Sequence, residues 1–320
     1  MRLDDIVLDD SEKITLALRS LYQRSGYARF RMDKFEKYDL YAQNKDFLVS
    51  ERVITFTNTD GELMALKPDV TLSVIQYLRD EPDELQKLCY NETVYRVSKG
   101  TGSFREIMQV GLECFGRVDR PCVGEVLLLA AKSLELVASS YVLEISHLDI
   151  LTKLLDDAVG GSPCRAEVLK CVAEKNTARA AALCRSAGAG AEETEALLAL
   201  MKLYGNAERV MPRLRALCEP RGLGAELSEL DAALDTLRAG GFSERVTLDF
   251  SAVSNMNYYN GVLFAGFVEG LPDSVLNGGQ YDKLMRKMGK ASRAIGFAVY
   301  LDRLERIGDT NNSGVVFQNA

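Results

Sequence analysis

The stretch FREIMQVGLECFG, residues 104–116, decides the fold of this chain. Side chains of a β-strand alternate between its two faces. One face is therefore apolar and carries Met108, Val110, Leu112 and Cys114. The other face carries Arg105, Ile107, Gln109, Gly111, Glu113 and Phe115. This second face is either an ordinary solvated surface or a pocket floor, where Gln109 and Glu113 point at a polar ligand and Gly111 leaves room for it.

A second strand, at residues 93–97, precedes this stretch, and the glycine-bearing loop 98–103 joins the two. Glu92, Val94 and Arg96 share one face by the same alternation. If the two strands pair as a hairpin, Arg96 comes close to the polar floor. In that position it is either a surface arginine or a clamp for an anion beside a carboxylate.

The remaining patterns predict further strands and helices on both sides of this hairpin. Strands are expected at residues 27–32, 53–56, 63–66, 142–145, 246–250 and 262–264, with 53–56 and 63–66 forming a hairpin that has Gly61 at positive φ. Helices are expected at residues 11–26, capped by Ser11, and at 69–78, 124–137 and 294–306. We expect a core at 1–306, a helical insertion at about 150–241 and a polar, disordered tail at 307–320. Antiparallel strands interleaved with helices favour an α+β fold.

Composition excludes several classes of protein. Lys and Arg total 39 against 46 Asp and Glu, a formal net charge of −7, whereas proteins that bind nucleic acid usually show a basic excess. The cysteines are scattered without a C-x-x-C pair, which predicts free thiols in a reducing cytoplasm: Cys89, Cys114, Cys122, Cys164, Cys171, Cys184 and Cys218. No signal peptide and no apolar run of the ~20 residues that a membrane span needs is evident. We therefore expect a soluble cytoplasmic protein without a metal or cofactor, since dinucleotide-binding and Walker motifs are also missing.

The hairpin sequence, Tyr95-Arg96 followed by the loop and residues 104–116, resembles motif 2 of the histidyl-tRNA synthetase family. Four further segments resemble motifs of that family in the same order: LKPDVT at 66–71, NYYNG at 257–261, NGGQYD at 277–282 and AIGFAVYLDRL at 294–304. Five matches in register over about 240 residues are a specific signal. The resemblance implies a class II aminoacyl-tRNA synthetase-like antiparallel sheet flanked by helices.

In that family the matching residues surround histidine and ATP. The resemblance implies a histidine-binding pocket made of Asp69, Thr71, Gln109, Glu113, Tyr258, Tyr259 and Tyr281, and vestigial nucleotide-site arginines Arg96 and Arg303. Asp69 would meet the α-amino group of histidine, although it is one methylene shorter than the glutamate of the family. The sole histidine, His147, has no partner evident in the sequence and is expected to be structural.

Several positions depart from the pattern of an active synthetase. Ser254 stands where the histidine-specific loop has the arginine that neutralises charge during amino-acid activation, and serine cannot supply that cation. Ser98 replaces an acidic residue of the motif 2 loop, and Tyr300 replaces a glycine of motif 3, where it crowds the adenine pocket. No counterpart of the family's anticodon-binding domain is expected. These departures predict that the chain has no catalytic residues and does not charge tRNA.

The whole pattern is similar to the synthetase-like regulatory subunits of short-form ATP phosphoribosyltransferase. That resemblance implies a non-catalytic protein that the catalytic subunit requires for activity and that mediates feedback inhibition by L-histidine in the first step of histidine biosynthesis. It also implies a homodimer within a larger hetero-oligomer, formed through a motif 1 region placed near residues 19–37. The alternatives are a histidine-tRNA ligase core and a stand-alone class II-like ligase for another carboxylic acid, which pyrophosphate exchange would reveal.

Overall fold

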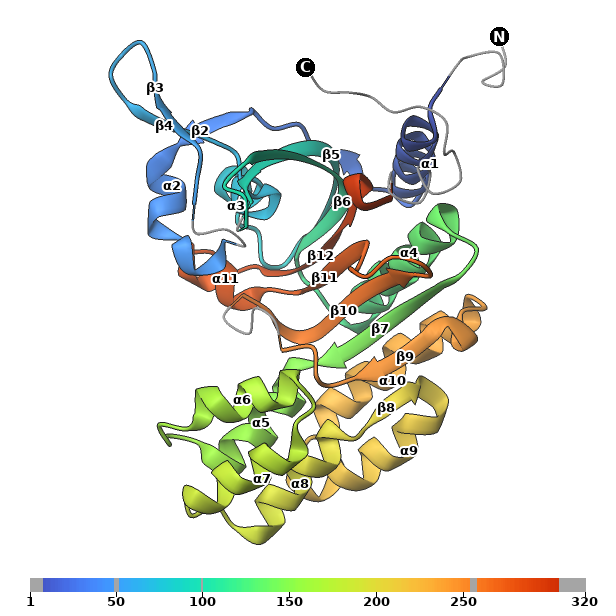
Figure 1. Cartoon of the computed structure of the whole chain (residues 1–320). Helices are drawn as coiled ribbons and strands as arrows, with labels where there is room; N and C mark the ends of the chain where they lie inside the picture. Colours follow the sequence, from blue (N-terminus) through green and yellow to red (C-terminus); the bar gives the residue numbers. More distant parts are fainter. Residues whose placement is uncertain (1–7, 49–51, 99, 254–257, 305–320) are drawn as a thin grey trace.

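Nine strands form one sheet in the computed structural model, which describes residues 8–48, 52–98, 100–253 and 258–304 (Figure 1). Their order is β1-β5-β6-β12-β11-β10-β7-β9-β8. The pairs β1/β5 and β7/β9 are parallel and the other neighbours are antiparallel, so the expected α+β fold is confirmed. The bounds are β1 Ala28–Arg29, β5 Leu85–Val97, β6 Phe104–Gly116, β7 Tyr141–His147, β8 Tyr204–Asn206, β9 Val246–Asp249, β10 Asn260–Val268, β11 Leu276–Gln280 and β12 Arg293–Tyr300.

Helices and a smaller sheet surround this large sheet. The small sheet has the order β2-β4-β3 and consists of β2 Phe35–Lys37, β3 Thr55–Thr57 and β4 Leu63–Leu66. The α-helices are α1 Asp10–Arg24, α2 Tyr38–Gln43, α3 Val70–Tyr77, α4 Arg120–Val137, α5 Leu148–Val159, α6 Arg165–Ala173, α7 Thr177–Ser186, α8 Ala191–Met201, α9 Ala207–Cys218, α10 Gly224–Ala239 and α11 Asp282–Lys287. Short 3-10 helices are η2 Lys45–Phe47, η3 Glu219–Arg221 and η4 Ser243–Arg245.

The two faces of the large sheet border different hydrophobic cores. Val110, Leu112 and Cys114 of β6 belong to the larger core, together with residues of α1, α4 and the helices after β7. Phe115 belongs to the smaller core, with residues of α3 and α11. The predicted alternation along β6 is therefore confirmed. The interpretation of its second face as solvated is wrong, because Gln109 and Glu113 are buried there.

Both predicted hairpins are present. β5 and β6 pair in antiparallel register from Leu85 opposite Gly116 to Val97 opposite Phe104. β3 pairs with β4, and Gly61 in the turn between them has φ +80°. The first of these hairpins sets the position of the polar floor, because it holds the strand that carries Glu113 against a full-length neighbour.

Two predictions near the N-terminus need correction. The first helix is capped by Asp9 and not by Ser11, because the Asp9 carboxylate accepts from the Glu12 amide (2.7 Å) while Glu12 accepts from the Asp9 amide (3.0 Å). This reciprocal capping box holds the helix start two residues earlier than expected. The strand predicted at 27–32 is reduced to Ala28–Arg29, where the chain pairs with the edge of β5.

The last predicted helix, 294–306, is wrong. Residues 293–300 form strand β12 between β6 and β11, in the middle of the large sheet, and residues 301–304 are helical. The residues from Ala294 to Val299 are buried on both faces, so the segment lacks the polar–apolar alternation that marks a half-exposed strand. The predicted tail, 307–320, lies outside the described residues.

The region predicted to be a helical insertion contains α5 to α10. It also contains strand β8, which was not predicted and which pairs with β9 at one edge of the large sheet. Helix α10 packs against α4, so the region shares the larger core with the sheet. Its division from the rest of the chain as a separate insertion stays a prediction.

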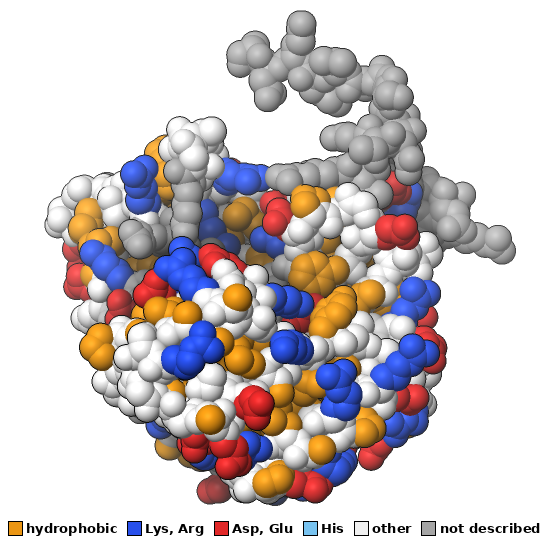
Figure 2. All heavy atoms as spheres, turned by 60° about the horizontal axis from the view of Figure 1, so that its bottom comes forward, with side chains coloured by type: hydrophobic (Ala, Val, Ile, Leu, Met, Phe, Trp, Pro, Cys, Tyr) orange, Lys and Arg blue, Asp and Glu red, His pale blue; other side chains and the backbone are white. Residues whose placement is uncertain are grey.

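The surface of this helical region is mixed in charge. Figure 2 shows basic and acidic side chains interspersed on the face that includes it. The helical region contains ion pairs such as Arg215–Asp231 and Arg238–Glu208. On that face the described residues form no broad field of one sign of the kind that attracts a polyphosphate backbone. Among the described helices, none is long and apolar enough to cross a bilayer.

Candidate ligand-binding site

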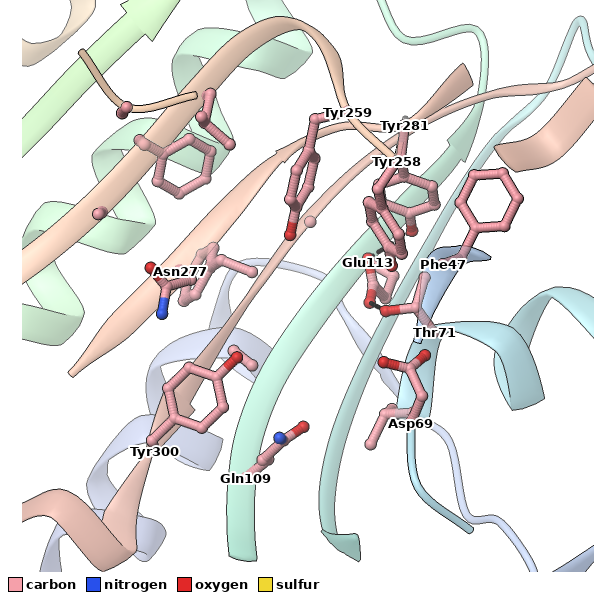
Figure 3. A pocket seen from close by; sticks show the side chains of 18 of the residues that line it. Phe47, Asp69, Thr71, Gln109, Glu113, Tyr258, Tyr259, Asn277, Tyr281 and Tyr300 are labelled. Atoms are coloured by element: carbon pink, nitrogen blue, oxygen red, sulfur yellow. Dashed lines mark hydrogen bonds between the residues drawn. The ribbon is translucent and has the colours of Figure 1, made fainter. Parts of the chain in front are cut away.

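A cavity of about 210 Å³ lies over the polar face of β6 (Figure 3). The residues that the sequence assigned to histidine or to a nucleotide all line it: Asp69, Thr71, Arg96, Gln109, Glu113, Tyr258, Tyr259, Tyr281 and Arg303. They come from segments that lie far apart in the sequence and meet over the centre of the large sheet. The structure thus brings the whole predicted set together, while the ligand that it holds stays a prediction.

Glu113 is the centre of one end of the cavity. Thr71 Oγ1 donates to its Oε1 (3.1 Å) and the Tyr281 hydroxyl donates to its Oε2 (2.5 Å). Burial raises the pKa of Glu113 to about 8 despite these two hydrogen bonds, and the negative charge of Asp69 adds to the effect. The carboxyl group is therefore largely protonated at neutral pH, and it can donate as well as accept a hydrogen bond.

Glycine at position 296 makes room for this carboxyl group. Gly296 of β12 lies directly opposite Glu113 of β6 in the antiparallel pairing. A Cβ atom on Gly296 would lie 1.8 Å from Glu113 Oε2 and 2.5 Å from the Leu112 carbonyl oxygen. No side chain fits there while Glu113 keeps its two hydrogen bonds.

Asp69 and Arg96 form the wall beside Glu113. Asp69 Oδ1 accepts from the Leu72 amide (2.9 Å) and so caps helix α3, which begins one residue after the predicted start at Asp69. Burial raises the pKa of Asp69, although this hydrogen bond and the charge of Arg96 oppose the rise. Arg96 Nε donates to the Pro68 carbonyl oxygen (3.0 Å), which fixes the arginine to the turn that carries Asp69. The Asp69 carboxylate also lines the cavity, where it can meet a cationic group such as an ammonium.

Aromatic rings enclose the same end. The rings of Tyr258 and Tyr259 are 4.5 Å apart between centroids, and those of Tyr258 and Tyr281 are 5.8 Å apart. Phe47 of η2 lies 6.0 Å from Tyr258. These rings shield the Glu113 end from water and offer faces on which a small planar group can stack.

At the other end of the cavity, the charged side chain already contacts neighbouring residues of the same chain. The Arg303 guanidinium lies over the Tyr300 ring, 4.3 Å from its centroid, and donates to the Ser274 carbonyl oxygen. Tyr300 of β12 is paired with Gln109 of β6, so both reach this end. Gln109 Nε2 is buried and has no hydrogen-bond partner among the described residues. This amide is consequently the group at this end that most needs a ligand acceptor.

Sequence reasoning missed several lining residues. Phe47, Tyr90, Glu144, Ser146 and Asn277 also face the cavity. The alternation along β5 and β7 could have indicated Tyr90, Glu144 and Ser146, but their approach to β6 or β10 depends on pairing that no local pattern specifies. Burial raises the pKa of Glu144 to about 7, with a further rise from Asp249. Ser254, expected to replace a catalytic arginine, lies outside the described residues.

His147 has a partner that the sequence did not reveal. The His147 ring is buried at the end of β7, and its Nε2 lies 3.2 Å from Glu229 Oε2 on helix α10. Neither residue lines the cavity. Among the described residues, no group of three His, Cys, Asp or Glu side chains could hold a metal ion. The chemistry that the cavity does offer is recognition through buried carboxyl, amide and hydroxyl groups.

Comparison with known proteins places this site in a family. A sequence model described as histidyl-tRNA synthetase matches residues 7–304. The ATP phosphoribosyltransferase regulatory subunit of Anaeromyxobacter sp. (strain Fw109-5) is 32% identical over 309 residues, which span 94% of this chain and 90% of that protein. The chain belongs to the histidyl-tRNA synthetase family, among its ATP phosphoribosyltransferase regulatory subunits.

Further members of this family are also similar to most of the chain. The ATP phosphoribosyltransferase regulatory subunit of Alkaliphilus metalliredigens is 26% identical over 288 residues, 88% of this chain and 73% of that protein. The crystal structure of an ATP phosphoribosyltransferase regulatory subunit/histidyl-tRNA synthetase from Bacillus halodurans has a TM-score of 0.81 at 26% identity. The similarity covers 96% of this chain and 81% of that one. The family resemblance and the synthetase-like fold predicted from the sequence motifs are confirmed.

Proposed function

We propose that this chain is the regulatory subunit of an ATP phosphoribosyltransferase in histidine biosynthesis. It associates in the cytoplasm with the catalytic subunit of that enzyme, as a homodimer within a larger hetero-oligomer. It binds L-histidine as an effector in the cavity over β6 and catalyses no reaction itself. Histidine acts by linkage: it binds one state of the assembly more tightly and shifts the catalytic partner toward its less active form.

The observation that carries the proposal is the environment of Glu113. A neutral imidazole presents one N–H donor and one nitrogen acceptor. A buried carboxyl group with a pKa near neutrality satisfies either of them, because it both donates and accepts. Asp69 lies in the same cavity and offers its carboxylate to an α-ammonium group, while Arg96 and the Gln109 amide are available to an α-carboxylate. Together the four groups offer partners for the imidazole, the α-ammonium and the α-carboxylate groups of histidine.

The state of the other end supports a role without catalysis. Arg303 matches the motif 3 arginine of the family, but its guanidinium already lies over the Tyr300 ring. A purine that needed this cation as a stacking partner would have to displace the tyrosine. Ser254 also cannot replace the arginine that an amino-acid-activating enzyme uses to neutralise phosphate charge. The names of the relatives, which describe them as regulatory subunits, point in the same direction.

The test is to assay a short-form ATP phosphoribosyltransferase catalytic subunit with and without this protein, over a titration of L-histidine. We expect activity to rise on mixing and to fall again as histidine is added. Co-elution of the two proteins on size-exclusion chromatography should accompany the activation. No change in rate together with no co-elution would exclude the regulatory role. Histidine-dependent exchange of pyrophosphate into ATP by this chain alone would instead indicate a ligase core.

A further inference from the structure

The tyrosines over the cavity lead into an irregular part of strand β10. In its pairing with β11, Asn260 lies opposite Gln280 and Leu263 lies opposite Gly279, so the register shifts between Asn260 and Leu263. Such a bulge takes amide groups out of the regular ladder and changes the direction of the chain. Tyr258 and Tyr259 come directly before it, so their placement over the cavity depends on its geometry.

The amide groups freed by the bulge bind side chains. The Val262 amide donates to Gln280 Oε1 (2.5 Å), and the Gly261 amide donates to Asp149 Oδ2 (3.2 Å) on helix α5. Gly261 has φ +55°, and a Cβ atom there would lie 2.0 Å from Gln280 Oε1. The bulge is consequently built around the Gln280 side chain, which is itself completely buried.

Helix α10 holds the far side of that side chain. Gln280 Nε2 donates to Glu229 Oε1 (3.1 Å), and the other carboxylate oxygen of Glu229 meets His147 Nε2 (3.2 Å). Although burial alone would raise the pKa of Glu229, the hydrogen bonds from His147 and Gln280 hold it below its usual value. Glu229 is therefore a charged acceptor, which gives stronger hydrogen bonds than a neutral one.

We propose that Glu229 of α10 and Asp149 of α5 are positioning residues for the ligand cavity. They fix the bulge at Gly261–Val262 and, through it, the tyrosine pair that covers the Glu113 end. The helical region between β7 and β9 thereby sets how well the cavity accepts its ligand, without any contact between Glu229 and that ligand. Where this concerns histidine affinity, it rests on the function proposed above.

The experiment compares Glu229→Ala with Glu229→Gln and with Asp235→Asn in the full chain. Glutamine keeps an oxygen acceptor for Gln280, and its NH2 group can donate to His147 Nε2 once the neutral ring carries its proton on Nδ1, so it is the conservative rescue. Asp235 is a matched carboxylate on the same helix. Its side chain is 69% exposed and forms an ion pair with Arg238. Two measurements are made: amide hydrogen exchange across residues 258–265, and the affinity for L-histidine by titration calorimetry.

We expect Glu229→Ala to speed amide exchange at the bulge about tenfold and to weaken histidine binding about tenfold. Glu229→Gln should stay within about threefold of the unmodified protein in both measurements. Asp235→Asn should give the same exchange rate and the same affinity as the unmodified protein. If Glu229→Ala does not fold, Asp149→Ala removes the acceptor of the Gly261 amide and tests the second anchor by the same two measurements.

Some outcomes would overturn the inference. A lower unfolding temperature of Glu229→Ala with unchanged exchange at the bulge and unchanged affinity would reduce Glu229 to a structural residue. An equal effect of Asp235→Asn would do the same. If the unmodified protein binds no histidine, the proposed function fails, but exchange at the bulge still decides whether Glu229 positions the tyrosine segment.

Discussion

The two ends of the cavity are built in opposite ways. At the Glu113 end, the carboxyl group is held by Thr71 and Tyr281, and a glycine opposite leaves its place open. At the Arg303 end, the guanidinium is already stacked on Tyr300 of the same chain. The Glu113 end already has its polar groups in place for a ligand, whereas at the other end the Arg303 guanidinium is already in contact with the Tyr300 ring. If the proposed function holds, this difference lets the fold recognise an amino acid at one end while a single aromatic side chain, Tyr300, occupies the arginine at the other.

The sharpest test of this comparison is to remove the central group of the open end. Glu113→Ala should weaken L-histidine binding about 100-fold, because it leaves polar groups of the ligand and of the cavity unpaired at a cost of about 2–3 kcal/mol. Titration calorimetry measures the change. Glu106→Ala, an exposed carboxylate on the same strand, is the control and should bind normally. Equal weakening by both substitutions would contradict the assigned role of Glu113.

A second test crowds the open end without removing any polar group. Gly296→Ala places a methyl group 1.8 Å from Glu113 Oε2, so the carboxyl group or strand β12 must move. We expect about tenfold weaker histidine binding and a loss of about 1–3 kcal/mol in the free energy of unfolding. Gly224→Ala is the control, because a Cβ atom there meets nothing within 4 Å. Unchanged affinity in Gly296→Ala would show that Glu113 has more freedom than the structure gives it.

The ends should also differ in their response to pH. The pKa of Glu113 rises from an ordinary 4.5 to about 8 on folding, so between these values the unfolded chain releases a proton that the folded chain keeps. The free energy of unfolding should therefore fall as pH rises across that window, by up to about 1.4 kcal/mol per pH unit from this group. Glu113→Gln should remove this contribution, and Arg303→Ala should retain it because arginine does not titrate there. Urea unfolding at several pH values across this window measures the effect. If the free energy of unfolding of Glu113→Gln changes with pH as steeply as that of the unmodified protein, Glu113 is not a buried, protonated carboxyl group.

The smallest effect is expected at the closed end. Tyr300→Gly, which introduces the residue of the family motif, should change histidine affinity by no more than about threefold, since the half-buried Arg303–Tyr300 stack lies at the opposite end from Glu113 and is worth about 1 kcal/mol. It should at the same time free Arg303 for a nucleotide, so ATP binding measured by calorimetry should increase. A loss of histidine affinity above about tenfold would mean that the two ends act as one site.

Much of this comparison could be read from the sequence, and its limits have physical causes. The alternation along 104–116 and the five motifs predicted nine site residues, and all nine line the cavity. They could be predicted because a strand face and the order of motifs are local properties of the sequence. Strand β12 was missed because both of its faces are buried, which removes the alternation. The contact of His147 with Glu229 joins residues 82 positions apart and depends on how α10 packs, so no local pattern indicates it.

The tyrosines around Glu113 have a practical consequence for optical spectroscopy. The chain contains 13 tyrosines and no tryptophan, so its near-ultraviolet circular dichroism comes largely from tyrosine. Such signals are strong only where rings are held in a fixed, asymmetric setting. Tyr258 and Tyr281 are buried and Tyr259 is half-buried. The centroid of the Tyr258 ring lies 4.5 Å from that of Tyr259 and 5.8 Å from that of Tyr281. The cavity therefore carries its own unlabelled reporter, and ligand entry can be followed as a change in ellipticity without attaching a dye.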